Sequence, residues 1–189
     1  MQNIKIDWNP DEFNTWIEFN IDQFNKTSLS SFTKDYLLNG FPESAAPFLS
    51  FGLSNNNFEF KTVAEYYAEY QLDSKTKNYW IFGSDGNGNP ICIDSNSNDE
   101  ILLLDHEQGF EPIQKINKNV SELFLCLLEY KNFIEQINSE FGEDGFFESK
   151  FTVTHLENLK TRFKKINSNI FTESEFWNGE ISMLFDEIT

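Results

Sequence analysis

The sequence predicts an α+β fold with a central antiparallel sheet flanked by helices and a helical C-terminal extension. Three observations lead to this prediction. Apolar residues with helical spacing open and close the chain, whereas short aromatic and β-branched runs between Asn-, Asp- and Gly-rich turns fill its middle. A length of 189 residues is also sufficient for a hydrophobic core of its own. Stabilisation by disulfides or metal is therefore not required.

The amino-terminal part favours two helices. Residues 11–25 place apolar side chains three and four positions apart, with Asn9 as a cap and Pro10 in the first turn. Residues 29–38 repeat this spacing, and Gly40 follows as a left-handed terminator. We therefore expect both segments to be helical.

The pattern then changes to one typical of strands. Residues 48–51 and 58–60 are short aromatic runs on either side of the polar turn 54–57, which predicts two strands in a hairpin-like arrangement. Residues 62–70 combine helical spacing with residue types that favour strands. We interpret them as a short helix or an irregular segment.

The clearest strand pattern of the chain comes next. Residues 79–83 and 90–94 flank the turn 84–89, whose Asp-Gly and Asn-Gly dipeptides tolerate positive φ angles. A third apolar run covers residues 101–104 after another polar turn. Together these segments predict an antiparallel meander.

The last part of the chain is helical by its spacing. The strongest pattern covers residues 119–141, with Asn119 or Ser121 as the cap and Gly142 at the end. Two further helices, joined by a polar turn, are expected beyond it at residues 154–166 and 173–188. We divide the chain into an α+β domain, residues 1–142, and a helical extension, residues 143–189, packed on the same domain.

Charge is the bulk property that says most about function. The chain has 14 Lys and Arg against 31 Asp and Glu, a net charge of −17 spread along its length. Such a field repels nucleic acid and anionic membranes and attracts basic partners, although acidity also keeps a Phe-rich protein soluble. Residues 1–7 lack the pattern of a secretory signal, and no stretch approaches the ~20 apolar residues of a membrane span. We expect a cytoplasmic protein that binds neither nucleic acid nor membrane.

Two turn motifs resemble ligand sites but depart from them. The glycine cluster 83–88 is followed by Pro90 and a strand, whereas a phosphate loop needs a helix amino terminus there. The alternating polar residues of the same turn resemble a calcium loop. However, Pro90 stands where that loop needs glycine, and Asn96 stands where a bidentate Glu would close it. A hairpin tip is the simpler interpretation.

Catalytic patterns are weak. Asp105-His106-Glu107 sets a histidine among carboxylates, but no nucleophile or metal motif accompanies it. Cys92 and Cys126 are far apart and have no neighbour at ligand spacing. We therefore expect no catalytic residues, no metal and no cofactor. A hydrolase that uses Asp105, His106 and a further carboxylate is kept as an alternative.

One helix gathers several of the basic side chains. Lys160, Arg162, Lys164 and Lys165 lie together on the segment 154–166. In an acidic protein such a cluster is more typical of a solvated helix face or of ion-pair partners than of a nucleic-acid site.

The middle of the chain contains several motifs in a fixed order. Gly40-Phe41-Pro42 precedes an aromatic strand, the segment 80–94 reads WIFGSDGNGNPICID, and a strand ending at Asp105 precedes the helix start NVSELF at 119–124. In this order the motifs resemble the SUKH superfamily. The first motif departs from the usual Gly-Leu-Pro by an apolar exchange. The resemblance covers roughly residues 29–135 and implies an α+β fold with a helix-flanked antiparallel sheet. The superfamily includes bacterial immunity proteins that neutralise polymorphic toxins and relatives of a yeast cell-wall-assembly regulator.

The resemblance implies a protein that acts by binding and blocking a cognate toxin. A nuclease toxin must be basic to hold nucleic acid, so an acidic surface would complement it. We expect partner contacts near the hairpin tip and the following strand, at Asp85, Asn87, Asp94, Asp99, Glu100, Asp105 and Glu107. The alternative that uses the same charge is an acidic nucleic-acid mimic that inhibits several DNA-binding proteins.

Overall fold

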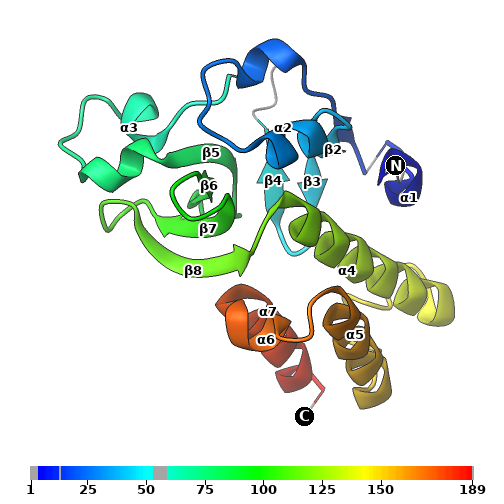
Figure 1. The fold of residues 1–189 in the computed structure, drawn as a ribbon. Coiled ribbons are helices and arrows are strands. Elements are labelled where there is room, and N and C mark those ends of the chain that lie inside the picture. The colour runs from blue at the N-terminus through cyan, green and yellow to red at the C-terminus, as the bar shows by residue number, and fades with distance from the viewer. Residues whose placement is uncertain (1–3, 13, 53–58, 189) are drawn as a thin grey trace.

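A six-stranded antiparallel sheet forms the centre of the computed structural model, which describes residues 4–12, 14–52 and 59–188 (Figure 1). Its strands follow in chain order: β3 (Ser44–Ala45), β4 (Leu49–Phe51), β5 (Tyr79–Ser84), β6 (Pro90–Asp94), β7 (Glu100–Asp105) and β8 (Glu111–Asn117). A separate two-stranded sheet pairs β1 (Trp16–Ile17) with β2 (Phe41–Pro42). Helices accompany both sheets, so the α+β class predicted from the sequence is confirmed.

The meander formed by β5, β6 and β7 agrees with the predicted order of strands. Trp80 pairs with Ile93, and Ile93 pairs with Ile101, so the three predicted strands lie side by side. Gly83 marks a shift in register between β5 and β6. A Cβ atom at this position would lie 2.1 Å from the carbonyl oxygen of Ser50, so glycine allows β4 to approach β5 closely.

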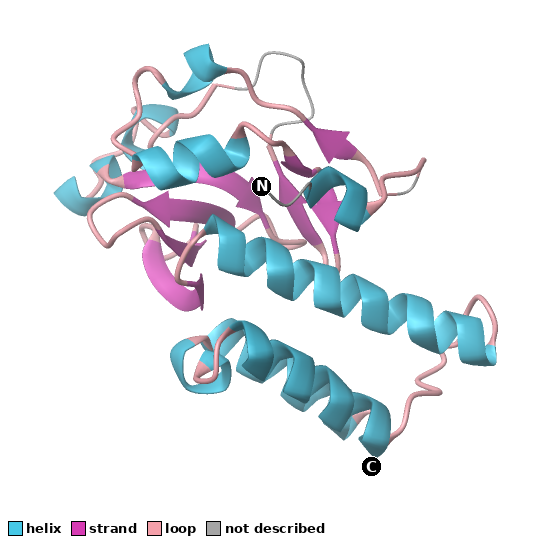
Figure 2. Ribbon diagram, turned by 45° about the vertical axis from the view of Figure 1, so that its right-hand side comes forward, coloured by secondary structure: helices cyan, strands magenta, loops and turns pink. Residues whose placement is uncertain are grey.

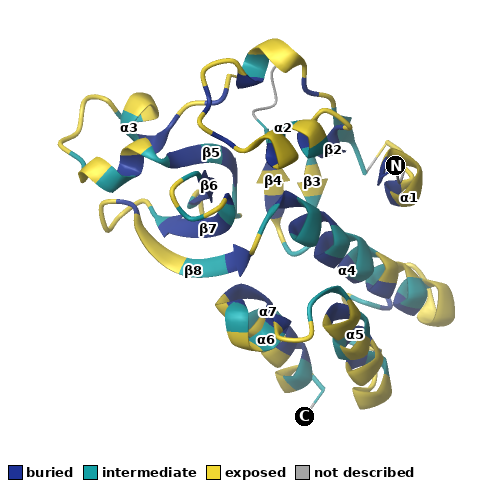
Figure 3. Cartoon of the chain, in the orientation of Figure 1, coloured by how far each residue is buried: buried dark blue, intermediate teal, exposed yellow. Residues whose placement is uncertain are grey.

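The two faces of the sheet belong to two apolar clusters, because successive side chains of a strand point to opposite sides. Trp80 and Phe82 face the main core, which also contains residues of α2 (Ser31–Leu37) and α4 (Val120–Phe141). Tyr79 and Cys92 face the opposite cluster. Figure 3 shows β5, β6 and β7 mostly buried and the far end of α4 mostly exposed.

The second cluster lies beneath a short segment that precedes β5. This segment contains α3 (Val63–Tyr66) and the 3₁₀ helix η2 (Ser74–Lys77). Thr62 caps α3 with a capping box to Glu65, which confirms the short helix expected in this region. Tyr67 and Leu72 pack against the buried side chains of the sheet.

Helix α4 lies between the sheet and the C-terminal helices, as Figure 2 shows. The C-terminal helices are α5 (Val153–Ile166), α6 (Ile170–Glu173) and α7 (Glu175–Asp186). Asn119 caps α4 and Gly142 ends it, as predicted. Within the described residues, neither α4 nor a shorter helix is long and apolar enough to cross a membrane.

The start of α7 is fixed to the edge strand β8 by three hydrogen bonds. The indole Nε1 of Trp177 donates to Asn117 Oδ1 over 2.9 Å, and Ser174 Oγ donates to the Lys115 carbonyl oxygen over 3.2 Å. The Lys115 amide donates to Glu175 Oε2 over 3.1 Å. The C-terminal helices also share one apolar core with the sheet, because buried side chains of both belong to the same cluster.

The helix predicted over residues 11–25 is wrong. The structure has β1 and the 3₁₀ helix η1 (Ile21–Phe24) there, and a helix α1 (Ile4–Trp8) precedes them. Asn14 donates its amide to Asp11 Oδ1 over 2.7 Å, and Asn20 begins η1 with a capping box. These side chains compete with the helical backbone pattern, and the pairing of β1 with β2 stabilises the extended alternative.

Asn9 does not cap a following helix either. Its φ angle of 52° places it in the left-handed region directly after α1. After Gly, Asn is one of the residues that most readily adopt this left-handed conformation. Asn9 thus ends α1 instead of starting the predicted helix.

The predicted hairpin around residues 54–57 is also wrong in its second strand. β4 is present as expected, but it pairs with β3 and β5. Glu59 and Phe60 lie outside the strands, and the Phe60 ring packs 5.1 Å from the ring of Phe24. The predicted turn itself and residue 58 lie outside the described residues.

A pH effect on stability is expected from α7. Burial raises the pKa of Glu180 to about 7. The neighbouring Tyr130 has a raised pKa because it is buried and lies near the carboxylates of Glu180 and Glu187. Between about pH 4.5 and 7 the folded protein therefore holds a proton that the unfolded chain has released, so stability falls as pH rises through this window.

We expect Glu180→Gln to remove this fall and to stabilise the protein at pH 8 by about 1–2 kcal/mol, a value lowered for partial solvent access. Urea denaturation of both proteins at pH 5 and pH 8 measures the difference. Glu143→Gln, at an exposed position, serves as the control. An unchanged pH dependence in Glu180→Gln would contradict the expected effect.

Candidate functional site

Three turns meet at one end of the six-stranded sheet, and we call them together the turn cluster. They are residues 46–48, 85–89 and 105–110. The first two follow β3 and β5, and the third begins with Asp105, the last residue of β7. Alternate turns of an antiparallel meander lie at the same end of the sheet. Asn89 and His106 join the second and third turns, because His106 Nδ1 lies 2.7 Å from Asn89 Oδ1. Gly86 lies close to Phe48 of the first turn, since a Cβ atom added to the glycine would be 3.4 Å from Phe48 Cβ.

Two carboxylates hold the backbone of this cluster in shape. Asp85 Oδ1 accepts hydrogen bonds from the amides of Asn87 and Asn89 at 2.9 and 2.8 Å. Asp105 Oδ1 accepts from the amides of Glu107 and Gln108 at 2.8 and 3.1 Å. Asp is common in turns for this reason. A carboxylate has about four acceptor positions, so both groups keep capacity for a partner in a fixed geometry.

The turn cluster is acidic. Asp85, Asp105 and Glu107 belong to it, and its three segments contain no Lys or Arg in their sequence. Glu107 is exposed. A group of carboxylates without basic neighbours in the same turns produces a negative potential, which raises the rate of encounter with a basic partner.

Exposed aromatic side chains accompany the carboxylates. The Phe48 side chain is 82% exposed at the tip of its turn, and its φ angle of 56° is positive. At the other side of the cluster, the Phe110 ring packs 4.5 Å from the Tyr67 ring. Tyr67 also contacts Tyr66 and Tyr70, which are exposed, and we call these three residues the tyrosine ledge.

Aromatic residues of this kind are enriched at protein interfaces, where they supply most of the binding energy. The order of the strands places Phe48 beside β4 and the tyrosine ledge beside the turn before β8. With about 4.8 Å between neighbouring strands, the surface spans roughly 20 Å. A standard complex buries about 800 Å² on each partner, a patch roughly 28 Å across, so the turn cluster and the tyrosine ledge extend over most of that width.

The seven residues predicted to contact a partner divide between the two ends of the sheet. Asp85, Asn87, Asp105 and Glu107 lie in the turn cluster. The others are Asp94, Asp99 and Glu100, at the opposite end, in and beside the turn between β6 and β7. The structure therefore brings four of them together and separates three.

The three residues at the opposite end interact within the fold. Asp94 and Asp99 are buried, with 6% and 3% of their surface exposed. Asp99 Oδ2 accepts the amide hydrogen of Ser30 over 2.9 Å, at the start of α2, and Glu100 forms an ion pair with Lys115. We do not include these three in the candidate site.

The structural role of Asp99 can be tested by its effect on the free energy of unfolding. Asp99→Ala removes the acceptor of a part-buried amide, so we expect a loss of about 1–3 kcal/mol in the free energy of unfolding. Glu107→Ala, at an exposed position with a free side chain among the described residues, should change it by less than about 0.5 kcal/mol. Urea denaturation measures both. Equal effects of the two substitutions would contradict the structural role of Asp99.

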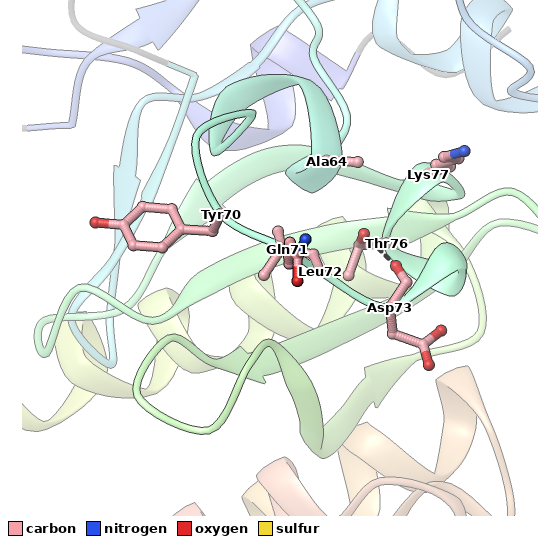
Figure 4. A pocket seen from close by; sticks show the side chains of 7 residues that line it. All are labelled: Ala64, Tyr70, Gln71, Leu72, Asp73, Thr76 and Lys77. Carbon is pink, nitrogen blue, oxygen red and sulfur yellow. Dashed lines mark hydrogen bonds between the residues drawn. The ribbon is translucent and has the colours of Figure 1, made fainter.

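A pocket of about 680 Å³ lies next to the tyrosine ledge (Figure 4). Its lining includes Leu72, Thr76 and Lys77. Figure 4 shows the Tyr70 ring and the Asp73 carboxylate pointing away from the centre of the group. The Thr76 hydroxyl donates to the Asp73 carbonyl oxygen over 2.6 Å. This lining does not bring a nucleophile and a base together, as a catalytic pocket requires.

Other reactive groups of the described residues do not converge either. No group of three or more His, Cys, Asp and Glu lies close enough to hold a metal ion in this part of the chain. Burial raises the pKa of the Cys92 and Cys126 thiols, which disfavours the nucleophilic thiolate. His106 contacts the amide oxygen of Asn89.

Sequence reasoning missed the aromatic part of the site. The sequence predicts a strand over residues 48–51, but Phe48 lies in the preceding turn. The signal that favours this position is Pro47, because proline marks turns. The exposure of Tyr66 and Tyr70 depends on how α3 packs on the sheet, which the spacing of the tyrosines does not determine.

Comparison with known proteins gives no match: neither a family model, nor a curated protein, nor a solved structure corresponds to this chain. The resemblance to the SUKH superfamily therefore stays a prediction.

Proposed function

We propose that this protein binds and blocks a basic protein partner, a cognate toxin of the nuclease type, in the cytoplasm. The observation that carries the proposal is the turn cluster, where exposed Phe48 accompanies Asp85, Asp105 and Glu107 without a basic residue in these turns. The resemblance to the SUKH superfamily, which includes immunity proteins, supports the same function.

The physical argument is one of complementarity. A nuclease needs a basic cleft to hold phosphate groups, and carboxylates presented on a firm scaffold can occupy such a cleft. Phe48 and the tyrosine ledge add apolar area that becomes buried in a complex. Because Asp85 and Asp105 already fix their turns by hydrogen bonds, little conformational entropy remains to be lost on binding.

The test uses the protein domain encoded beside this gene. We expect a basic domain that binds the purified protein, with an association rate constant that falls about tenfold or more between low and high salt. Surface plasmon resonance at several salt concentrations measures the rate constants. Absence of binding to this neighbouring domain would contradict the proposal.

A charge-reversal substitution tests whether the partner binds at the turn cluster. Glu107→Lys, in the turn cluster, should slow association about tenfold or more, because it places a like charge opposite a basic partner. Glu143→Lys is the matched control, because both carboxylates are exposed and Glu143 follows α4, outside the turn cluster. Equal effects of the two reversals would show that net charge, and not the turn cluster, determines binding.

The second candidate, an acidic nucleic-acid mimic, is favoured by the net charge of −17. A mimic binds several unrelated DNA-binding proteins, whereas an immunity protein binds one toxin. Phe48 and the tyrosine ledge have no role in imitating phosphates, so they favour the first candidate. Binding to a panel of basic DNA-binding proteins distinguishes the two functions.

A further inference from the structure

A pocket between the C-terminal helices has chemistry that the proposed function does not use. Residues of α5, α6 and α7 and of the turn between α5 and α6 line an open hollow of about 420 Å³, a volume in the range of small-molecule sites. Its polar side includes Lys160 and Lys164 of α5 and Asn178 of α7. In a chain where acidic residues outnumber basic ones by 31 to 14, none of the described residues that line this pocket is acidic.

The side chains of the two lysines differ in the contacts that they make within the protein. They are four residues apart on α5 and so lie on the same helix face. Lys160 Nζ lies 3.1 Å from Glu157 Oε1 and 5.2 Å from the centre of the Phe185 ring. Lys164 Nζ makes no hydrogen bond or ion pair within the described part of the chain. Lys164 is thus the cation that remains free for a ligand.

The pocket lining also contains apolar side chains. Ile181 is buried, and Phe171 and Phe185 are partly buried. Phe171 is held in place by the Phe163 ring, whose centre lies 6.0 Å away. A flat apolar group can therefore lie against these side chains while a charged group reaches the lysines.

We propose that this pocket binds a small amphipathic anion, a planar apolar ring that carries one phosphate or carboxylate group. The net negative charge of the protein does not prevent this, because at physiological salt charges more than about 8 Å apart are largely screened. Lys164 acts at contact distance, where screening is weak. Asn178 adds an amide donor from the facing helix.

The test is an NMR titration of the full-length protein at physiological salt, with phenyl phosphate as the probe. We expect chemical-shift changes in α5, α6 and α7 with a Kd of about 1 mM, the range of a fragment-sized ligand. Inorganic phosphate carries only the anionic group of the probe, and phenol carries only its ring. Each should bind at least about tenfold more weakly than phenyl phosphate. Benzoate in a parallel titration distinguishes a phosphate site from a carboxylate site.

A pair of variants assigns the charge. Lys164→Gln should raise the Kd for phenyl phosphate about five- to tenfold, whereas Lys165→Gln, an exposed neighbour outside the pocket lining, should leave it unchanged. Both positions are exposed, so the amide spectrum should otherwise be retained. The proposal is overturned if phenyl phosphate shifts no resonance in these helices, if one half of the probe binds as well as the whole, or if both variants lose equal affinity.

Discussion

Replacing Trp177 by alanine lowers the free energy of unfolding by about 3–5 kcal/mol, the largest stability effect that we expect in this protein. Trp177 is fully buried between the C-terminal helices and the sheet. Its ring packs 5.0 Å from Phe163 and 6.0 Å from Tyr130, and its indole nitrogen donates to Asn117. Alanine leaves a cavity and also leaves the buried Asn117 oxygen without this donor. Urea denaturation followed by circular dichroism measures the loss.

Two controls separate the causes. Trp177→Phe keeps most of the volume and removes the hydrogen bond to Asn117, so it should cost about 1–3 kcal/mol. Met183→Ala, on the same helix and 53% exposed, should cost less than about 0.5 kcal/mol. Because α7 packs on β8, we expect one cooperative transition in each variant. A separate transition for residues 143–189 would show that they fold as an independent unit.

Replacing Phe48 by alanine should weaken binding to the basic partner by about 2–4 kcal/mol, or roughly 30- to 1000-fold. The ring is 82% exposed in the free protein, so it loses little packing when it is removed. In a complex that covers the turn cluster, the same ring becomes buried next to Asp85 and contributes as an anchor. Isothermal titration calorimetry measures the affinity, and urea denaturation should show an unchanged fold.

Phe147 provides the matched control for this substitution. It is 78% exposed, and it lies in the turn after α4, beside the C-terminal helices. Phe147→Ala should leave the affinity within about twofold. We further expect Phe48→Ala to act on the dissociation rate, whereas Glu107→Lys acts on association. An equal loss in both phenylalanine variants would place the interface elsewhere.

The sequence predicts best those elements whose local signals agree with their tertiary surroundings. The turn residues 84–89 and the strand-forming residues on both sides of them all indicate a meander. Asn119 marks the start of α4 in the same way. Residues 11–25 also have helical spacing, but Trp16 and Ile17 pair with β2 instead. Spacing alone does not report such a distant partner.

β8 escaped prediction because its sequence is mostly polar. Pro112 interrupts the strand pattern, and the residues around it alternate little between apolar and polar. An edge strand tolerates both features, because one side of it lacks a neighbouring strand. The position at the edge of the sheet, which the sequence does not reveal, is what makes this strand possible.

The acidic residues of the candidate site come from the sequence, but their arrangement comes from the structure. Asp85 lies in a predicted hairpin turn and Asp105 at the end of a predicted strand, and the structure brings both to one end of the sheet. Asp99 has the same residue type in a similar turn, yet it is buried against the start of α2. A carboxylate that fixes a distant amide and one that faces solvent look alike in a sequence, because the distinction depends on long-range packing.

The contacts at the start of α7 have a consequence for self-association. An exposed edge strand is a template on which a second molecule can add its own strand, the first step toward aggregates. At β8 the amide and carbonyl of Lys115 are taken by side chains of Glu175 and Ser174. At the other edge, β3 has only two residues. The contacts of Lys115 therefore shorten the run of backbone groups that β8 offers to a second molecule, which lowers the tendency of a chain with 21 phenylalanines to pair edge to edge.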